Sequence, residues 1–570
     1  METIVFSGLV FEWNTRTRIT TRRRRTTVKT LEETAGPEGS GALTRRQLLK
    51  GALSTAIVGG LVAAGGASPS AAQSSKTATT SGTLKPKPGG DFRLGVTGGG
   101  PSDMIDGQNF LDTPDQARLV SQFETLLVFD DDYKVTNDGL AAEVTQDSAT
   151  QWTIRLRKGI EFSNGKTLQA EDVIYSLQRI LDKKNGLPGY SQLASIDAKA
   201  IRALDNYTVR LHLRSANSVL DEGLAQFNNG IVPVGYAKWP APQIGTGAYV
   251  LKSFTPGQQS VSTRNKNYWR SGEPYLDTVT ITDYAEPTAQ VNALLSNEID
   301  AMTALPAAQV PVIKGHGGLS VLVSDTAEWV PICMAIDMPP FDNNDVRQAM
   351  RYIVNRPQTV EQVISGYGRV ANDLFSPFDP DFDSALPQRH QDIDKAKFLL
   401  NKAGLSKLTI DLNTTNGAAG MVELASVFAT QAAAAGVTVN VLNDPNFYGN
   451  SYLKLAFSVD YWGTRNYLAQ VSQSMLSTSP FNETHWPAQS GVGTNYAKLY
   501  SQALATLNPS VRKEIIHEMQ TIEYNDGGYI IPFFLDLMDA YSSRVAGLNP
   551  NKGTLPLDYF GHGFRNIWFT

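Results

Sequence analysis

Apolar and polar residues alternate in two short segments of the chain, and both predict half-buried strands. Residues 152–157 read WTIRLR and residues 207–213 read YTVRLHL. Residues 171–181 instead repeat their apolar positions every three or four residues, which predicts an amphipathic helix. A second helix is expected to open at Asn508-Pro509, with its apolar stripe at Val511, Ile515, Met519 and Ile522. The alternation of short strands and helices from about residue 89 predicts an α/β fold.

The N-terminal segment carries the pattern of an export signal. Residues 44–50 read TRRQLLK, an apolar stretch follows over 51–67, and Ser70-Ala71-Ala72 offers small residues for cleavage. A charged start, an apolar middle and a small-residue end are typical of a secretory signal. The pair Arg45-Arg46 resembles a twin-arginine signal. We therefore predict a leader over 1–72 with its signal at 44–72, and export to the periplasmic or extracellular face of the cytoplasmic membrane; an uncleaved anchor is the alternative.

Charge and cysteine content narrow the classes of function. The 570 residues carry 50 Lys and Arg against 55 Asp and Glu, a formal charge of −5, so no nucleic-acid partner is expected. Residues 73–88 are rich in Ser, Thr, Lys, Pro and Gly and predict a flexible linker. The single cysteine, Cys333, lies in an apolar run and is expected to be a small buried hydrophobe.

Signatures of catalysis are not found in the sequence. The six histidines do not pair at metal-ligand spacing, and neither H-E-x-x-H nor G-x-S-x-G occurs. Gly165-Lys166-Thr167 resembles the end of a phosphate-binding loop, but Ile160 stands where the first glycine is needed. We predict a turn there, no metal, no cofactor and no enzymatic activity; a hydrolase with a dispersed catalytic set is the alternative.

Several motifs resemble, in order, those of the family 5 extracellular solute-binding proteins of the oligopeptide, dipeptide and nickel type. They are ETLLVFD at 124–130, the long signature WTIRLRKGIEFSNGKTLQAEDVIYSL at 152–177, GTGAY at 245–249, NKNYW at 265–269 and PFD at 340–342, which is followed by VRQA at 346–349. The resemblance covers about residues 89 to 570.

This resemblance implies a two-lobed clamp of the class II periplasmic-binding-protein type with an extra inserted α/β domain. Lobe I would take 89–132, 243–345 and 533–570, the inserted domain 133–242, and lobe III 346–532. A monomer would capture a peptide-like, sugar-like or other small organic solute between the lobes and deliver it to the transmembrane subunits of an ABC permease. Presentation of the solute to a chemoreceptor is the alternative.

One segment departs from the family pattern. Peptide-binding relatives carry an Asp after the Trp of a lobe III motif, where it pairs with the peptide amine. Here residues 462–469 read WGTRNYLA, which places Arg465 at that position. A guanidinium repels an ammonium but suits a carboxylate, a phosphate or a sugar hydroxyl. Pairing of Arg465 with a neighbouring Asp or Glu, such as Asp460, is the alternative. The residues expected to contact solute are Trp462, Arg465, Tyr461, Asn466, Trp329, Trp486, Gly245 and Gly247.

Overall fold

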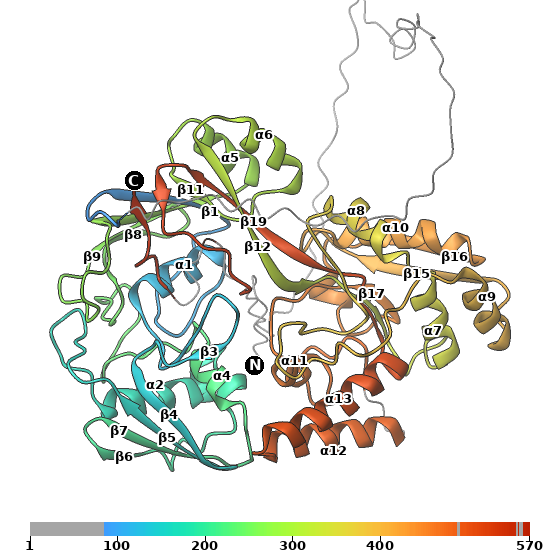
Figure 1. Cartoon of the computed structure of the whole chain (residues 1–570), viewed down its shortest axis with the longest axis horizontal. Coiled ribbons are helices and arrows are strands. Elements are labelled where there is room, and N and C mark those ends of the chain that lie inside the picture. Colours follow the sequence, from blue (N-terminus) through green and yellow to red (C-terminus); the bar gives the residue numbers. More distant parts are fainter. Residues whose placement is uncertain (1–84, 487–490, 554–556, 558–561) are drawn as a thin grey trace, which may run out of the picture. The chain divides into compact units, whose positions relative to one another are not determined.

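The computed structural model describes residues 85–486, 491–553, 557 and 562–570. The predicted leader over 1–72 lies outside the described residues. Lys85–Thr570 fall within a single compact unit. Within the described ranges, no helix combines the length and the apolar character that a membrane span requires. The predicted α/β class is confirmed, because helices alternate with the strands of three sheets of four or more strands (Figure 1).

The largest sheet has eight strands in the order β12-β19-β11-β1-β10-β9-β8, with β14 paired to β19. The central strand β1 runs parallel to both β10 and β11 and buries Phe92, Leu94 and Val96 completely. Helices α1, α5 and α6 pack on this sheet. The strands are β1 (Asp91–Thr97), β8 (Tyr249–Thr255), β9 (Gln259–Arg264), β10 (Thr278–Tyr284), β11 (Ala301–Met302), β12 (Leu319–Trp329), β14 (Gly368–Val370) and β19 (Phe533–Ser542), and the helices are α1 (Thr113–Gln122), α5 (Pro287–Leu295) and α6 (Val310–Gly315).

A four-stranded antiparallel sheet follows in the order β4-β5-β7-β6, and it confirms three local predictions. Strands β5 and β7 coincide with the two alternating segments, and α2 begins and ends where the apolar repeat does. The turn predicted at Gly165 is also present, since its φ is +84°. The elements are β4 (Ala141–Ser148), β5 (Gln151–Leu156), β6 (Arg202–Asp205), β7 (Thr208–His212), α2 (Ala170–Leu181), η1 (Lys183–Asn185), α3 (Tyr190–Leu193) and α4 (Leu220–Ala225).

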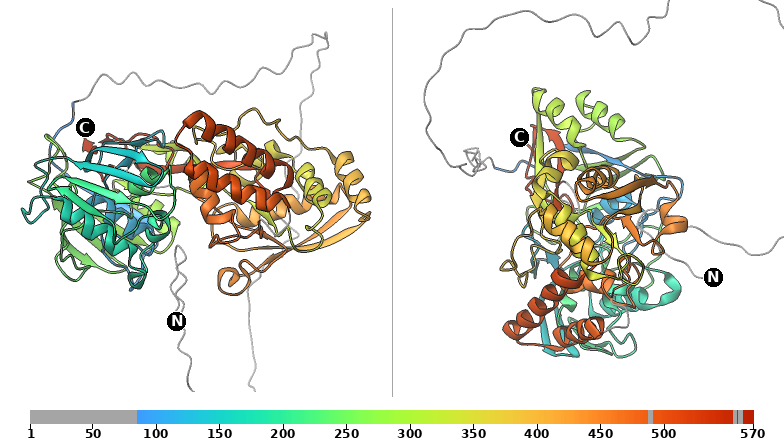
Figure 2. Two further views of the ribbon diagram at one scale, coloured as in Figure 1. Left: turned by 90° about the horizontal axis from the view of Figure 1, so that it is seen from below. Right: turned by 90° about the vertical axis from the view of Figure 1, so that its right-hand side faces the viewer.

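The third sheet has five strands in the order β16-β15-β17-β13-β18. Its strands are β13 (Ile332–Met334), β15 (Leu408–Thr414), β16 (Val437–Asn443), β17 (Phe457–Val459) and β18 (Tyr529–Ile530). The helices of this part of the chain are α7 (Asn344–Ile353), α8 (Arg356–Ile364), α9 (Ile393–Lys402), α10 (Met421–Ala433), α11 (Tyr467–Ser474), α12 (Gly491–Ala505) and α13 (Pro509–Asp526). Helices α12 and α13 pack side by side (Figure 2).

Helix α13 begins at Pro509 with Asn508 as its cap, as predicted, and the predicted apolar stripe is confirmed at Ile515, Met519 and Ile522, which pack into one buried cluster, but not at Val511. Val511 is 45% exposed, and the buried residues of the helix are Ile516, Met519, Gln520 and Glu523. The remaining short elements are β2 (Val128–Phe129), β3 (Val135–Thr136), β20 (Val545–Ala546), β21 (Trp568–Phe569), η2 (Ala307–Gln309) and η3 (Phe447–Ser451).

The chain passes four times between the eight-stranded and the five-stranded sheet, because β14 belongs to the first sheet and lies between β13 and β15 of the second. Two of these passages join consecutive strands directly. Strand β12 ends at Trp329 in the first sheet and β13 begins at Ile332 in the second. Strand β18 ends at Ile530 in the second sheet and β19 begins at Phe533 in the first. Each of these two direct passages spans only two residues, 330–331 and 531–532. The domain boundaries expected from the sequence stay a prediction, because strand pairing alone does not delimit domains.

Candidate functional site

Two of the candidate tryptophans meet where the chain first leaves the large sheet. Trp329 ends β12, and Trp462 follows β17; each backbone N–H donates to the other's carbonyl oxygen, over 3.0 and 2.9 Å. Their rings stack with centroids 6.0 Å apart, and Trp329 also stacks on Phe375 with centroids 5.5 Å apart. Trp329 is 1% exposed and Trp462 is 7% exposed. Trp329 therefore supports Trp462 from within the core.

A buried glutamate holds the indole of Trp462. Trp462 Nε1 donates to Glu483 Oε1 over 2.7 Å, and the same oxygen accepts from Tyr529 Oη over 3.0 Å. Burial raises the pKa of Glu483 well above its usual range, and the neighbouring Asp460 adds to this effect. The thiol of Cys333 lies 3.7 Å from the same carboxyl group and is buried, as predicted. Trp462 is thus fixed by stacking and by a hydrogen bond.

Arg465 lies half-buried on the ring of Trp462, with its guanidinium carbon 5.2 Å from the ring centroid. Its Nη1 makes a long 3.4 Å contact to the carbonyl of Gly463. Burial lowers the pKa of Arg465, while Tyr133, Tyr461 and Glu328 raise it through their charge. Among the described residues, no carboxylate comes within 4.0 Å of this guanidinium.

The alternative pairing of Arg465 with Asp460 is not seen. Asp460 instead accepts from Tyr448 Oη over 2.7 Å and from the backbone N–H of Tyr461 over 2.9 Å. The carboxyl group whose charge raises the pKa of Arg465 is Glu328, a half-buried residue whose own pKa burial raises to about 8. Arg465 is therefore a partly desolvated cation whose charge is not neutralised by a direct ion pair in the described chain.

Residues on both sides of Arg465 contact segments that are distant in sequence. Tyr133 Oη donates to the carbonyl of Thr464 over 3.1 Å, and Asn466 Nδ2 donates to Glu222 Oε1 over 3.0 Å. Close by, the backbone N–H of Ser218 donates to the carbonyl of Leu504 over 2.9 Å. The segment 462–466 thus faces the segment around Tyr133 and helix α4, which lie at or within the predicted inserted domain.

Trp486 belongs to the same buried cluster as Trp329 and Trp462, whereas Gly245 and Gly247 pack against the end of α1. Trp486 is 2% exposed and packs edge-on against Tyr496 with centroids 5.6 Å apart. A Cβ at Gly245 would lie 2.0 Å from the carbonyl oxygen of Gln122, and one at Gly247 would lie 2.5 Å from its carbonyl carbon. Close packing against the end of α1 accounts for both glycines. Their expected contact with solute stays a prediction.

Sequence reasoning missed Tyr133, Glu222 and Glu328. Glu328 lies 137 residues before Arg465, and the Asn466–Glu222 contact joins residues that are 244 apart. No spacing pattern relates them, because the fold alone brings them together. The motif segment around Trp462 and Arg465 was the signal in the sequence that pointed to this region.

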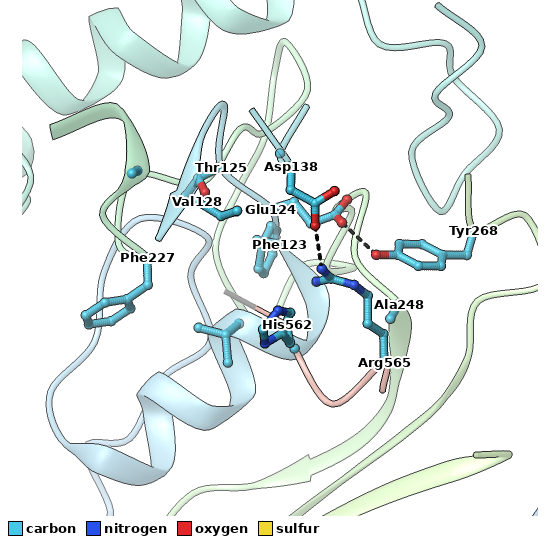
Figure 3. A pocket seen from close by; sticks show the side chains of 14 residues that line it. Phe123, Glu124, Thr125, Val128, Asp138, Phe227, Ala248, Tyr268, His562 and Arg565 are labelled. Atoms are coloured by element: carbon cyan, nitrogen blue, oxygen red, sulfur yellow. Dashed lines mark hydrogen bonds and ion pairs between the residues drawn. The ribbon is translucent and has the colours of Figure 1, made fainter. Parts of the chain in front are cut away.

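A small cavity lies elsewhere, between α1, the segment 123–139 and the C-terminal residues (Figure 3). Glu124 accepts from Tyr268 Oη over 2.7 Å, and Asp138 pairs with Arg565 over 3.0 Å at its wall. The cavity measures about 30 Å³. That volume holds about two water molecules and excludes an organic solute.

One group of carboxylates approaches metal-ligand spacing. Oxygens of Asp103, Asp112 and Asp115 lie within 4.8 Å of one another. The guanidinium of Arg118 is fully buried beside them and lies 3.2 Å from both Asp103 and Asp115. Because Arg118 already supplies positive charge to this group, the arrangement is that of a buried ion network.

The family model for bacterial extracellular solute-binding proteins, family 5 Middle, matches residues 136–483. The glutathione-binding protein GsiB of Escherichia coli K12 is 24% identical over 462 residues, covering 78% of this chain and 89% of GsiB. The solved ABC transporter substrate-binding protein CtaP from Listeria monocytogenes superposes with a TM-score of 0.75 at 20% identity, over 85% of this chain and all of CtaP.

A second solved structure, the periplasmic binding protein DppA from Helicobacter pylori in complex with the peptide STSA, has a TM-score of 0.69 at 19% identity. It covers 85% of this chain and 98% of DppA. These superpositions confirm the predicted two-lobed fold.

Proposed function

Because the chain belongs to the family 5 bacterial extracellular solute-binding proteins, we propose that it binds a small organic solute between its lobes and delivers it to the transmembrane subunits of an ABC importer. The two-lobed fold supports this function, since such clamps close around a ligand by hinge motion. The relatives named for glutathione, and solved with a peptide, indicate the size of solute that the fold accommodates. We infer a binding protein without catalytic activity that acts as a monomer.

We further propose that Arg465 holds an anionic or hydroxyl-rich group of the solute while Trp462 packs against an apolar or sugar face. The observation that supports this proposal is the environment of the half-buried Arg465 guanidinium. It lies over the ring of Trp462, and among the described residues no carboxylate comes within 4.0 Å of it. A partly desolvated cation is stabilised by an incoming anion. The planar fork of arginine also suits a carboxylate or phosphate in particular.

The test begins with native mass spectrometry of freshly purified protein, which identifies a co-purifying solute. Calorimetric titration of that solute then compares wild type with Arg465→Ala, Arg465→Lys and Trp462→Ala. Loss of one partner of a desolvated charged pair predicts weakening by about two to three orders of magnitude for Arg465→Ala. Arg465→Lys should recover only part of this, because an ammonium lacks the fork.

The matched control is Arg214→Ala. Its arginine side chain is 58% exposed, and its ion pair with Asp197 is long, at 3.8 Å. This variant should bind like wild type. Wild-type affinity in Arg465→Ala would instead assign Arg465 a structural role. Protein that binds no solute in either measurement would refute the proposed function itself.

We also propose that residues 44–72 direct export through the twin-arginine pathway. The pair Arg45-Arg46 before Leu48-Leu49 supports this, because that pathway reads an arginine pair. Replacing both arginines by lysine should leave precursor in the cytoplasm, as measured by cell fractionation. Normal export of that variant would contradict the twin-arginine assignment.

A further inference from the structure

The four-stranded sheet β4-β5-β7-β6 has one covered face and one face that is open to solvent. The covered face, on which α2 packs, carries the buried residues Trp152, Ile154, Val209 and Leu211 (Figure 1). Successive side chains of a strand point to opposite faces, so Arg155 on β5 and Arg210 on β7 lie on the open face. Arg202 on the edge strand β6 joins them, because it pairs in register with Arg210. Three arginines therefore gather on one side of this sheet.

Two of these arginines face each other across β6 and β7. Directly opposite side chains have Cβ atoms about 4.5–5.5 Å apart, and like charges in that position destabilise a sheet. Arg202 donates to the backbone carbonyls of Lys199 and Ile201, over 2.6 and 2.8 Å. The side chain of Arg210 makes no hydrogen bond or ion pair with any described residue. Within the described ranges no carboxylate lies within 4.0 Å of either guanidinium, so both are open to an anion.

A groove continues this surface past the end of β5. It measures about 610 Å³, and its lining includes Arg155, Lys158, Asp205 and Tyr207. Lys158 Nζ lies 5.5 Å from the ring centroid of Tyr207 and forms no ion pair with a described carboxylate. The two nearby acids have other partners: Asp205 accepts from the N–H of Tyr207 over 2.7 Å, and Glu143 pairs with Arg155 over 3.2 Å. The volume lies in the range that accommodates a small polar group.

The charge of this part of the chain differs from that of the rest of the folded protein. Residues 133–242 carry 13 Lys and Arg against 11 Asp and Glu, whereas residues 243–570 carry 22 against 30. Such an asymmetry orients a protein in an electric field. An anionic surface repels the acidic part and attracts the open face of this sheet.

The chemistry of the open face favours a phosphate-bearing surface over an acidic protein. Stable protein interfaces have an apolar core, but the open face presents mainly arginine, lysine and threonine side chains. Leu204 on β6 is a large apolar side chain beside them and is 48% exposed. The planar fork of arginine suits phosphate. Basic residues with a small apolar contact are sufficient for reversible binding to an anionic bilayer.

We propose that Lys158, Arg202 and Arg210 form a basic face that binds the headgroups of an anionic phospholipid membrane. This contact holds the protein at the membrane surface with the β4-β5-β7-β6 sheet towards the lipid. The inference goes beyond the proposed function, because capture of a solute by Arg465 and Trp462 does not require this face.

The test uses the full exported protein and sedimentation with vesicles of phosphatidylcholine, with or without phosphatidylglycerol. Wild type is compared with the double variant Arg202→Gln/Arg210→Gln. The matched control is Lys397→Gln/Lys407→Gln, which removes two positive charges from exposed residues elsewhere on the surface. Urea denaturation checks the fold, and the first variant should be at least as stable as wild type because a like-charged pair is removed.

Wild type should bind vesicles that contain phosphatidylglycerol and not those of phosphatidylcholine alone, and added salt should weaken the binding. Each basic residue near an anionic surface strengthens binding about five-fold, so Arg202→Gln/Arg210→Gln should bind about twenty-five-fold more weakly. Lys397→Gln/Lys407→Gln should bind like wild type. Inorganic phosphate should compete no better than chloride at equal ionic strength, because a single phosphate lacks the summed potential of a bilayer.

Four results would overturn the basic face. They are equal binding to both kinds of vesicle, unchanged binding of Arg202→Gln/Arg210→Gln, displacement by inorganic phosphate beyond the effect of chloride, and binding to polyglutamate without binding to vesicles. The third would assign the groove to a soluble phosphate compound, and the fourth would assign the face to an acidic protein. Solute affinity of the double variant should equal that of wild type in every case, so the proposed function is tested separately.

Discussion

Several buried carboxyl groups in the described chain are held by tyrosine hydroxyls rather than by cations. Glu523 on α13 accepts from Tyr467 Oη over 2.9 Å and from Tyr496 Oη. Burial raises its pKa from an ordinary 4.5 to about 8. The folded protein therefore keeps Glu523 protonated at neutral pH, whereas the unfolded chain ionises it.

This difference predicts a pH-dependent contribution of Glu523 to stability. Its contribution is fully present below pH 4.5 and is lost as the pH rises towards about 8, because only the unfolded state releases the proton. The free energy of unfolding of wild type, relative to Glu523→Gln, should fall by at most about 1.4 kcal/mol per pH unit in that window. Urea denaturation of both proteins at several pH values measures this difference.

Glu514→Gln provides the control, because Glu514 is an exposed residue on the same helix. Its unfolding free energy relative to wild type should vary little over the same range. A constant difference between wild type and Glu523→Gln across the window would show that Glu523 is ionised in the folded protein.

At the scale of single residues, the sequence predicted Cys333 as a buried thiol and singled out Arg465 by its motif position. It could not predict the contacts of either residue. Cys333 meets Glu483, 150 residues away, and Arg465 lies on Trp462 with its charge unpaired by any described carboxylate. Such contacts depend on the fold, because the residues involved share no local pattern.

At the scale of single elements, periodicity located β5, β7 and α2 well, because each buries an apolar face in a regular repeat. On α13 it located most of the core-facing stripe but included the exposed Val511 and missed the buried polar residues. The buried face contains Gln520, which accepts from Asp383 N over 2.6 Å, and Glu523, which is bound by two tyrosines. The spacing of apolar residues cannot identify buried polar side chains whose hydrogen bonds are provided by the fold.

The loop 245–247 allows a prediction that separates packing from solute contact. A Cβ at Gly245 would lie 2.0 Å from the backbone oxygen of Gln122, which cannot move aside as a side chain can. Gly245→Ala should therefore destabilise the protein by about 1–3 kcal/mol, the range of overpacking, as measured by urea denaturation. Solute affinity of the folded fraction should be unchanged.

Gly315→Ala is the matched control, because nothing lies within 4 Å of a Cβ at that position. Its stability should equal or slightly exceed that of wild type, since Gly315 ends helix α6 and alanine is the better helix former. If Gly245→Ala instead retained stability and lost affinity for solute, the loop would belong to the binding site.

For the whole molecule, ordered motifs were more informative than periodicity. Six short segments in family order predicted the two-lobed fold, which the superpositions confirm. They did not predict how helix α4 meets the segment 462–466, because Glu222 and Asn466 lie outside those motifs. The fold was therefore accessible from the sequence, whereas the arrangement around Arg465 required the structure.

The two direct passages between the sheets, 330–331 and 531–532, predict a hinge. Solute should shift the lobes from an open to a closed arrangement and lower the radius of gyration in small-angle scattering. It should also stabilise the protein by about 2.7 kcal/mol at a hundred times its Kd.

Tyr133→Phe removes the hydrogen bond to Thr464 while retaining the ring that stacks on Phe129 at 4.3 Å. We assign this hydrogen bond to the closed arrangement, so this variant should bind solute about two- to ten-fold more weakly. Its scattering curve at saturating solute should match that of wild type. A tightly bound solute that changes neither the scattering nor hydrogen exchange at the two passages would contradict hinge closure.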